Sequence, residues 1–134
     1  RNLLIATWNV NSIRTRLSQI IDWINQVNPD ILCLQETKVM DDSFPVEPFE
    51  KLGYSVEVYG QKSYNGVAII SKIKPENVKK GFYGFNDSNH NIEIFLDQKR
   101  LISLSVGNHQ KCRSRKCTAH SYREQWSFAI LEAN

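Results

Sequence analysis

Two polar residues stand where two apolar segments end, and their side chains could bind a hard metal cation. Asn9 follows the apolar residues 3–8, and Glu36 lies just beyond the apolar residues 31–34. Mg²⁺ prefers oxygen ligands and usually takes only one or two carboxylates, keeping water in its other positions. Glu36 would bind the cation directly, and Asn9 would add an amide oxygen or hold an outer-sphere water. The pair is therefore a candidate Mg²⁺ site.

The segment between these residues predicts a helix that brings them to one edge of a sheet. Residues 3–8 and 31–34 are short apolar runs typical of buried strands. Asn11 or Ser12 would cap the start of the helix, and Pro29 would end it. The apolar positions at helical spacing are Ile13, Leu17, Ile20, Ile21, Ile24 and Val27. Such a strand–helix–strand unit makes the strands parallel, so both carboxyl ends meet where α/β sheets usually bind ligands.

Each of the two residues also has an ordinary structural explanation. Asn after a strand is commonly a cap, and Glu at the start of a loop is commonly solvated. Spacing alone therefore favours the structural explanation over a metal site.

Length and composition indicate one small globular domain, and the strand–helix–strand unit makes its class α/β. The chain has 134 residues, of which 41% are apolar and 23% charged. No apolar run approaches membrane-spanning length and no signal peptide opens the chain, so we expect a cytoplasmic protein with no membrane partner. We also expect the intact protein to be a monomer. The three Cys residues form no even disulfide framework, and Cys33 lies in an apolar run as a small hydrophobe.

After the second strand, the sequence predicts a loop over 41–48 and a helical turn over 49–52. Further strands are predicted over 54–59 and 67–70. Residues 92–96 and 101–106 flank a turn and predict a hairpin. If these elements form one sheet and one helix layer, one apolar face of the sheet remains uncovered.

Three motifs make the chain resemble the exonuclease III family of DNA-repair nucleases, within the endonuclease/exonuclease/phosphatase superfamily. They are ATWNVNSIRTRL at 6–17, PDILCLQETK at 29–38 and GQKSYNGVAIIS at 60–71, and the resemblance runs from Leu3 to Leu104. It implies a portion of a four-layer αββα sandwich with mixed sheets. It also implies Mg²⁺-dependent phosphodiester hydrolysis, with Mn²⁺ as the alternative cation. The implied reactions are incision 5′ to abasic sites, 3′→5′ exonuclease action and removal of 3′-blocking groups.

The same resemblance assigns roles to individual residues. The metal-binding Glu of the family falls on Glu36 and its active-site Asn on Asn9, while Asn11 stands where some relatives carry an acidic residue. The implied partner is double-stranded DNA with abasic sites or 3′ ends. The residues expected at the DNA backbone are Arg14, Thr15, Ser63, Tyr64, Asn65 and Arg100. Arg forks and backbone amides suit that role because they position phosphates without reading sequence.

Several segments that carry family chemistry do not occur in these 134 residues. No YVPN, GDFN or SDH segment follows Val106, so the corresponding active-site Tyr, water-activating Asp and Asp–His pair are absent. Hydrolysis needs an activated nucleophile, a metal and leaving-group stabilisation together. We therefore expect 1–106 to be the N-terminal part of the domain, and the chain as given to be inactive or nearly so.

Residues 107–134 form a basic tail without resemblance to the family. It holds 5 Lys and Arg against 2 Asp and Glu, whereas 1–108 hold 12 of each. Three explanations stay open: an out-of-frame or foreign segment, which we favour, a basic DNA-binding arm, or a zinc site using His109, Cys112, Cys117 and His120. Apolar residues between Tyr122 and Ala133 also fall at helical spacing.

Overall fold

The computed structural model describes residues 3–60, 62–63, 65–80, 92–97, 100–104, 117–121 and 127–133. The chain opens with β1 (Leu3–Asn9), α1 (Ile13–Val27) and β2 (Ile31–Gln35). β1 and β2 are parallel, in a register that runs from Ile5 opposite Ile31 to Asn9 opposite Gln35. The predicted strand–helix–strand unit is therefore confirmed.

Polar side chains and a left-handed residue define the ends of α1. The Ser12 hydroxyl accepts a hydrogen bond from the Thr15 backbone N–H at 3.3 Å, so Ser12 is the N-cap. At the other end Asn28 adopts φ 53° and its N–H donates to the Ile24 carbonyl at 2.7 Å. Pro29 follows directly and cannot continue the helix.

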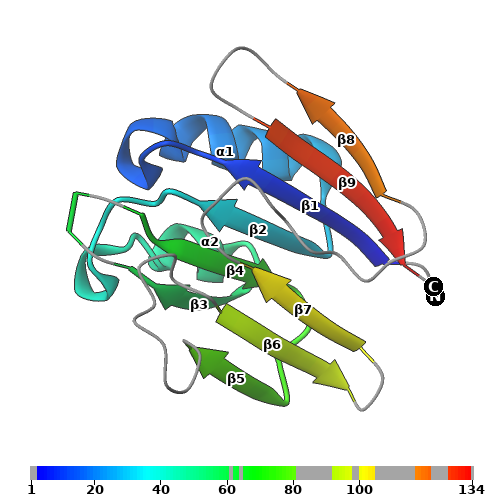
Figure 1. The fold of residues 1–134 in the computed structure, drawn as a ribbon. Coiled ribbons are helices and arrows are strands. Elements are labelled where there is room, and N and C mark those ends of the chain that lie inside the picture. Colours follow the sequence, from blue (N-terminus) through cyan, green and yellow to red (C-terminus); the bar gives the residue numbers. More distant parts are fainter. Residues whose placement is uncertain are drawn as a thin grey trace.

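The remaining elements complete two sheets. They are η1 (Asp41–Ser43), α2 (Glu47–Lys51), β3 (Ser55–Tyr59), β4 (Val67–Ser71), β5 (Asn77–Lys80), β6 (Ile92–Asp97), β7 (Arg100–Leu104), β8 (Cys117–Ser121) and β9 (Ser127–Ala133). One sheet has the strand order β3-β4-β2-β1-β9-β8 and the other β5-β6-β7 (Figure 1). In the larger sheet β1 and β2 are parallel and the other pairs antiparallel, so it is the mixed sheet expected.

The tail contributes two strands to the larger sheet. β9 is antiparallel to β1, from Leu3 opposite Ala133 to Trp8 opposite Phe128, and β8 pairs with β9 at the sheet edge. Residues 127–133 are thus a strand, and the helical spacing noted there does not describe them. Sheet pairing with β1 overrides a periodicity that short segments often show. The origin of the tail stays a prediction.

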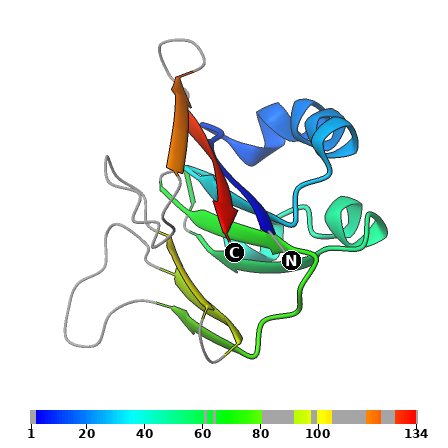
Figure 2. The same ribbon diagram turned by 90° about the vertical axis from the view of Figure 1, so that its right-hand side faces the viewer.

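Helices cover one face of the larger sheet and the smaller sheet covers the other (Figure 2). On the helix side, Ile13, Ile20 and Ile24 of α1 pack with alternate residues of β1 and β2 such as Leu34. On the opposite side, Ile92 and Ile94 of β6 are buried against Ile31 and Ile69. The elements therefore form two sheets instead of one, and β6 covers the apolar face of β2 and β4 that a single sheet would have left open. These layers form an αββ portion of the expected sandwich.

No helix in the described part of the chain is long and apolar enough to span a membrane.

At the end of the sheet opposite the β1 and β2 arrow tips, a buried tyrosine connects the segment before β3 to the segment before β2. The Tyr54 hydroxyl donates to the Pro29 carbonyl at 2.6 Å, and the Lys72 ammonium lies 5.8 Å from the centre of the Tyr54 ring. Lys72 also donates to the Asn28 side-chain oxygen at 2.5 Å. Burial, and secondly the negative charge of Asp30, raise the pKa of Tyr54 from 10.0 to about 12.

We predict that the protein loses stability in alkaline solution as Tyr54 ionises. Because the folded pKa of about 12 lies above the unfolded value, this stabilisation is complete below pH 10 and is lost as the pH rises through 12. Tyr54→Phe should remove that pH dependence and cost about 1 kcal/mol at neutral pH, since the Pro29 carbonyl loses its donor. Urea unfolding at several pH values, with tyrosinate absorbance, measures both. A variant with the same alkaline slope as the parent would contradict the assignment.

Candidate metal and nucleic-acid site

The backbone ladder between β1 and β2 continues into the two loops beyond the strands. Asn9 and Gln35 form the last strand pair. The next hydrogen bonds join Val10 N–H to the Gln35 carbonyl at 3.0 Å, Ser12 N–H to that of Glu36 at 2.8 Å, and Ile13 N–H to that of Thr37 at 3.1 Å. The segment entering α1 is thereby fixed against the segment that carries Glu36. The two strand ends meet as the parallel arrangement predicted.

A third loop, the one before β4, is joined to the same edge. Thr37 N–H donates to the Gly66 carbonyl at 3.2 Å, and Lys38 N–H donates to the Asn65 carbonyl at 2.8 Å. The Lys38 ammonium in turn donates to the Asn11 side-chain oxygen, across to the first loop. All three loops that carry predicted site motifs are therefore linked by hydrogen bonds.

These loops hold most of the unusual backbone of the described residues. Seven non-glycine residues in the described part have positive φ, and all except Asn28 lie in the three loops. The six are Asn11 at 45°, Ser12 at 94°, Glu36 at 53°, Lys38 at 59°, Ser63 at 69° and Asn65 at 52°. Left-handed conformations of non-glycine residues cost free energy and concentrate at functional sites. The cluster marks this edge as a candidate site independently of the sequence motifs.

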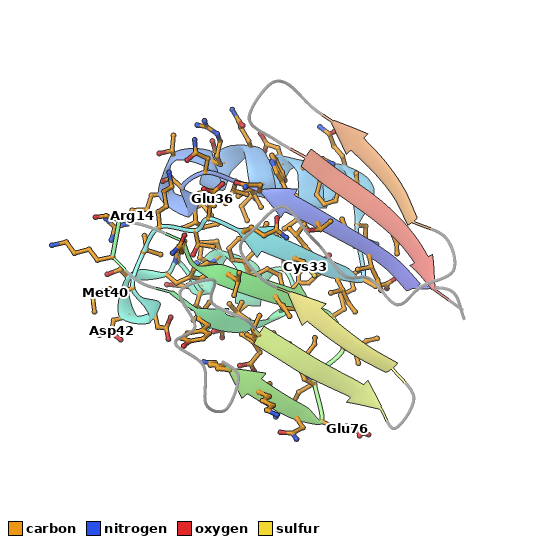
Figure 3. All side chains as sticks on the ribbon, viewed as in Figure 1. Arg14, Cys33, Glu36, Met40, Asp42 and Glu76 are labelled. Carbon is orange, nitrogen blue, oxygen red and sulfur yellow. The ribbon has the colours of Figure 1, made fainter. Side chains whose placement is uncertain are left out.

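Asn9 and Glu36 both lie at this edge with partly exposed side chains. Figure 3 shows Glu36 beside the arrow tips of β1 and β2, with Arg14 at the same end of the sheet. The Asn9 side-chain oxygen accepts from Asn11 N–H at 3.2 Å. Within the described part of the chain, no hydrogen bond or ion pair engages the Glu36 carboxylate. That carboxylate is therefore available to a cation.

The donor set is that of an open cation site. Among the described residues, no group of three or more His, Cys, Asp or Glu side chains could hold a metal ion. One carboxylate beside one amide instead fits a hard cation that keeps water or substrate oxygens in its remaining positions. A tightly enclosed structural metal needs more protein ligands than these loops supply.

The residues expected at the DNA backbone differ in where they lie. Arg14 and Thr15 are exposed in the first turn of α1, and Ser63 is exposed in the loop before β4, while Asn65 is partly buried there. Tyr64 lies outside the described residues. Arg100 is the first residue of β7, whose start is at the opposite end of the molecule from the β1 and β2 arrow tips (Figure 1). The roles of all six residues stay predictions.

Four residues of this edge were not found from the sequence. Thr7 and Gln35 are buried polar residues that bond to each other, Lys38 bridges two loops, and Gly66 allows a close approach. The signal for Gln35 was present in the alternation of β2, because Ile31, Cys33 and Gln35 share one face of a strand. Only the folded chain shows Lys38 near Asn11, since no spacing rule links two loops.

Comparison with known proteins gives one family match and several relatives. The model of the Endonuclease/Exonuclease/phosphatase family matches residues 6–133. The chain is 38% identical over 100 residues to Exodeoxyribonuclease III of Haemophilus influenzae, and 34% identical over 135 residues to DNA repair nuclease APEX1 of Danio rerio. These alignments cover 75% and 93% of this chain but only 34% and 41% of the relatives. The chain thus spans well under half of their length.

Solved structures agree with the sequence matches. An AP endonuclease from Archaeoglobus fulgidus has a TM-score of 0.66 and 46% identity, over 69% of this chain and 36% of its own. The 3′ phosphatase NExo from Neisseria, bound to a product DNA hairpin, has a TM-score of 0.70 and 36% identity, over 75% and 40%. The resemblance drawn from the sequence motifs is therefore confirmed.

We predict that Gly66→Ala destabilises the protein more than Gly53→Ala. Both glycines have left-handed φ, 92° and 89°, so each substitution costs roughly 1 kcal/mol in backbone strain. A Cβ on Gly66 would lie 2.2 Å from the Thr37 hydroxyl oxygen, whereas one on Gly53 meets nothing within 4 Å. Overpacking should add about 1–3 kcal/mol at Gly66 alone. Urea unfolding measures the difference, and equal losses would show that the two loops do not approach so closely.

Proposed function

This chain belongs to the endonuclease/exonuclease/phosphatase family, and we propose that it forms the N-terminal part of a DNA-repair nuclease that hydrolyses phosphodiester bonds with a divalent cation. The observation that carries the proposal is the Glu36 carboxylate. It has no hydrogen bond or ion pair within the described part of the chain, and it stands beside Asn9 where three hydrogen-bonded loops meet. The names of the relatives, which include an exodeoxyribonuclease and an AP endonuclease, support this reading.

Glu36 would bind the cation, with Mg²⁺ the first choice and Mn²⁺ the alternative. Its oxygen ligand and the neighbouring Asn9 amide match the preference of Mg²⁺ for few protein oxygens and several waters. A bound cation of this kind stabilises negative charge on phosphate oxygens. Asn9 would orient a water or a phosphate oxygen next to Glu36, since its amide can both donate and accept.

The loops around Glu36 would hold the DNA backbone. Arg14 and Thr15 lie in the first turn of α1, and Ser63 and Asn65 lie in the loop before β4. The start of α1 and the loop before β4 are both hydrogen-bonded to the loop of Glu36. Arg14 supplies a fork of donors for phosphate, and the helix start favours negative charge. The proposed partner is double-stranded DNA with an abasic site or a 3′ end. For Tyr64 and Arg100 the role in DNA contact rests on the motifs alone.

The proposed reactions belong to the whole protein of which these residues form part. They are incision 5′ to abasic sites, 3′→5′ exonuclease action and removal of 3′-blocking groups. The last of these is favoured by the likeness to a 3′ phosphatase bound to product DNA. The residues of this chain supply the cation-binding corner, and groups that act as a unit are lost as a unit. A non-catalytic fragment that binds DNA and metal is the alternative.

We predict that Glu36→Gln abolishes Mg²⁺ and Mn²⁺ binding while leaving the fold intact. The substitution keeps the size of the side chain and removes the carboxylate that would bind the cation. Free Mn²⁺ measured by electron paramagnetic resonance reports binding, and Mg²⁺ competes for the same site. Glu57→Gln, a partly exposed strand residue of β3, is the matched control and should bind as the parent does.

The same variants separate the nuclease from the binding fragment. A duplex with an abasic site is added in Mg²⁺, and both retention and strand cleavage are measured. Metal-dependent cleavage that is lost in Glu36→Gln supports an active nuclease. Salt-sensitive binding without cleavage, equal in parent and Glu36→Gln, would instead identify a DNA-binding fragment. The metal role of Glu36 is decided by the Mn²⁺ measurement: normal Mn²⁺ binding by Glu36→Gln would contradict it.

A further inference from the structure

Three polar residues lie on the face of the larger sheet that meets the smaller sheet, directly below the candidate site. Asn9 and Gln35 are opposite each other in the parallel β1–β2 register, and Thr7 precedes Asn9 by two positions on the same face. Thr7 is 4% exposed and Gln35 is 1% exposed, although Cys33 and Ile31 on the same face of β2 are apolar. A buried polar pair in this place needs a reason beyond packing.

The Gln35 amide uses only one of its two ends. Its nitrogen donates to the Thr7 hydroxyl at 2.5 Å, while its buried oxygen has no hydrogen-bond partner among the described residues. Exchanging the amide oxygen and nitrogen does not remove the problem, because one end would still face Thr7 and the other would still be unpaired. Gln35 thus presents a fixed amide end that lacks a partner.

The side-chain nitrogen of the neighbouring Asn9 has no hydrogen-bond acceptor among the described residues. The Asn9 side-chain oxygen accepts from Asn11 N–H. An amide offers oxygen to a cation only if its nitrogen end is directed elsewhere. The unpaired Gln35 oxygen is an acceptor on the opposite residue, and it could hold that nitrogen.

We propose that Gln35 is a positioning residue for Asn9. Anchored by Thr7, the Gln35 oxygen accepts a hydrogen bond from the Asn9 nitrogen and keeps the Asn9 oxygen directed to the cation site at Glu36. The structure holds both partners opposite each other with the acceptor unpaired, and the bond forms when Asn9 turns toward the site. This inference rests on the proposed cation site. Such supporting hydrogen bonds orient ligands, and their loss typically weakens metal affinity by about 10- to 100-fold.

The experiment uses the complete chain with Gln35→Met, Thr7→Val and Thr7→Ser. Met and Val keep the size of the replaced side chains but lose the amide and the hydroxyl, whereas Ser retains the hydroxyl. We expect Mn²⁺ affinity to fall by about tenfold or more in Gln35→Met and Thr7→Val. Thr7→Ser should bind within a fewfold of the parent. Electron paramagnetic resonance of free Mn²⁺ measures all four proteins.

A second readout, taken at Mg²⁺ concentrations that saturate each variant, reports on the Asn9 side chain itself. In a ¹⁵N-labelled chain, the Asn9 side-chain NH₂ signals, assigned with Asn9→Asp, should shift when Mg²⁺ is added to the parent and to Thr7→Ser. The same shift should be lost in Thr7→Val and Gln35→Met. A purely structural effect of these substitutions would lower the melting temperature without changing the Mg²⁺ response. If Gln35→Met fails to fold, the comparison of Thr7→Val with Thr7→Ser decides the matter.

The two proposals fail in different ways. If Glu36→Gln abolishes Mn²⁺ binding while Gln35→Met and Thr7→Val bind as the parent does, Gln35 has no positioning role and the cation site stands. If Glu36→Gln binds Mn²⁺ normally, the cation site is wrong, and so is the inference that depends on it. If Thr7→Val and Gln35→Met both lose affinity and the Asn9 response, with Thr7→Ser retaining both, the proposal is supported.

Discussion

The backbone ladder of β1 and β2 does not stop where the strands stop, and the candidate site depends on this continuation. Three further hydrogen bonds tie the segment after Asn9 to the segment that carries Glu36, and two more tie the latter to the loop before β4. A loop is normally the most mobile part of a fold. Here the continued ladder allows strained residues such as Glu36 and Lys38 to keep left-handed conformations, because neighbouring bonds over-determine their backbone.

The two apolar layers hold that ladder in place from both faces. Trp8 and Leu34 pack toward the helices, whereas Ile5 and Cys33 pack toward β6. With both faces buried, a register slip would expose apolar side chains on either side. The polar residues Thr7 and Gln35 stand at the site end of the second layer. Thr7 and Gln35 therefore lie between the apolar core and the candidate binding site at the strand ends.

Much of the fold was predictable because local signals were strong. The periodicity of α1, its Ser12 cap and the stop at Pro29 agree with the structure, as do β1, β2, β4 and the β6–β7 hairpin. The polar strand β5 and the tail strands were missed. The sequence around β5 is exposed and lacks an alternating apolar pattern, and β9 forms by pairing with a strand more than one hundred residues earlier. No local pattern carries such information.

The sequence by itself determined the residue types that could do chemistry and the strand ends where they stand. Asn9 and Glu36 follow apolar runs separated by one helix, and parallel pairing then leaves little freedom in where they meet. Only the tertiary structure decided which other groups join them. Lys38 donates a hydrogen bond to Asn11, and Gln35 donates one to Thr7. The lack of a side chain at Gly66 lets Thr37 pack closely against it. Such contacts depend on how three loops close upon one another, which is a property of packing in space.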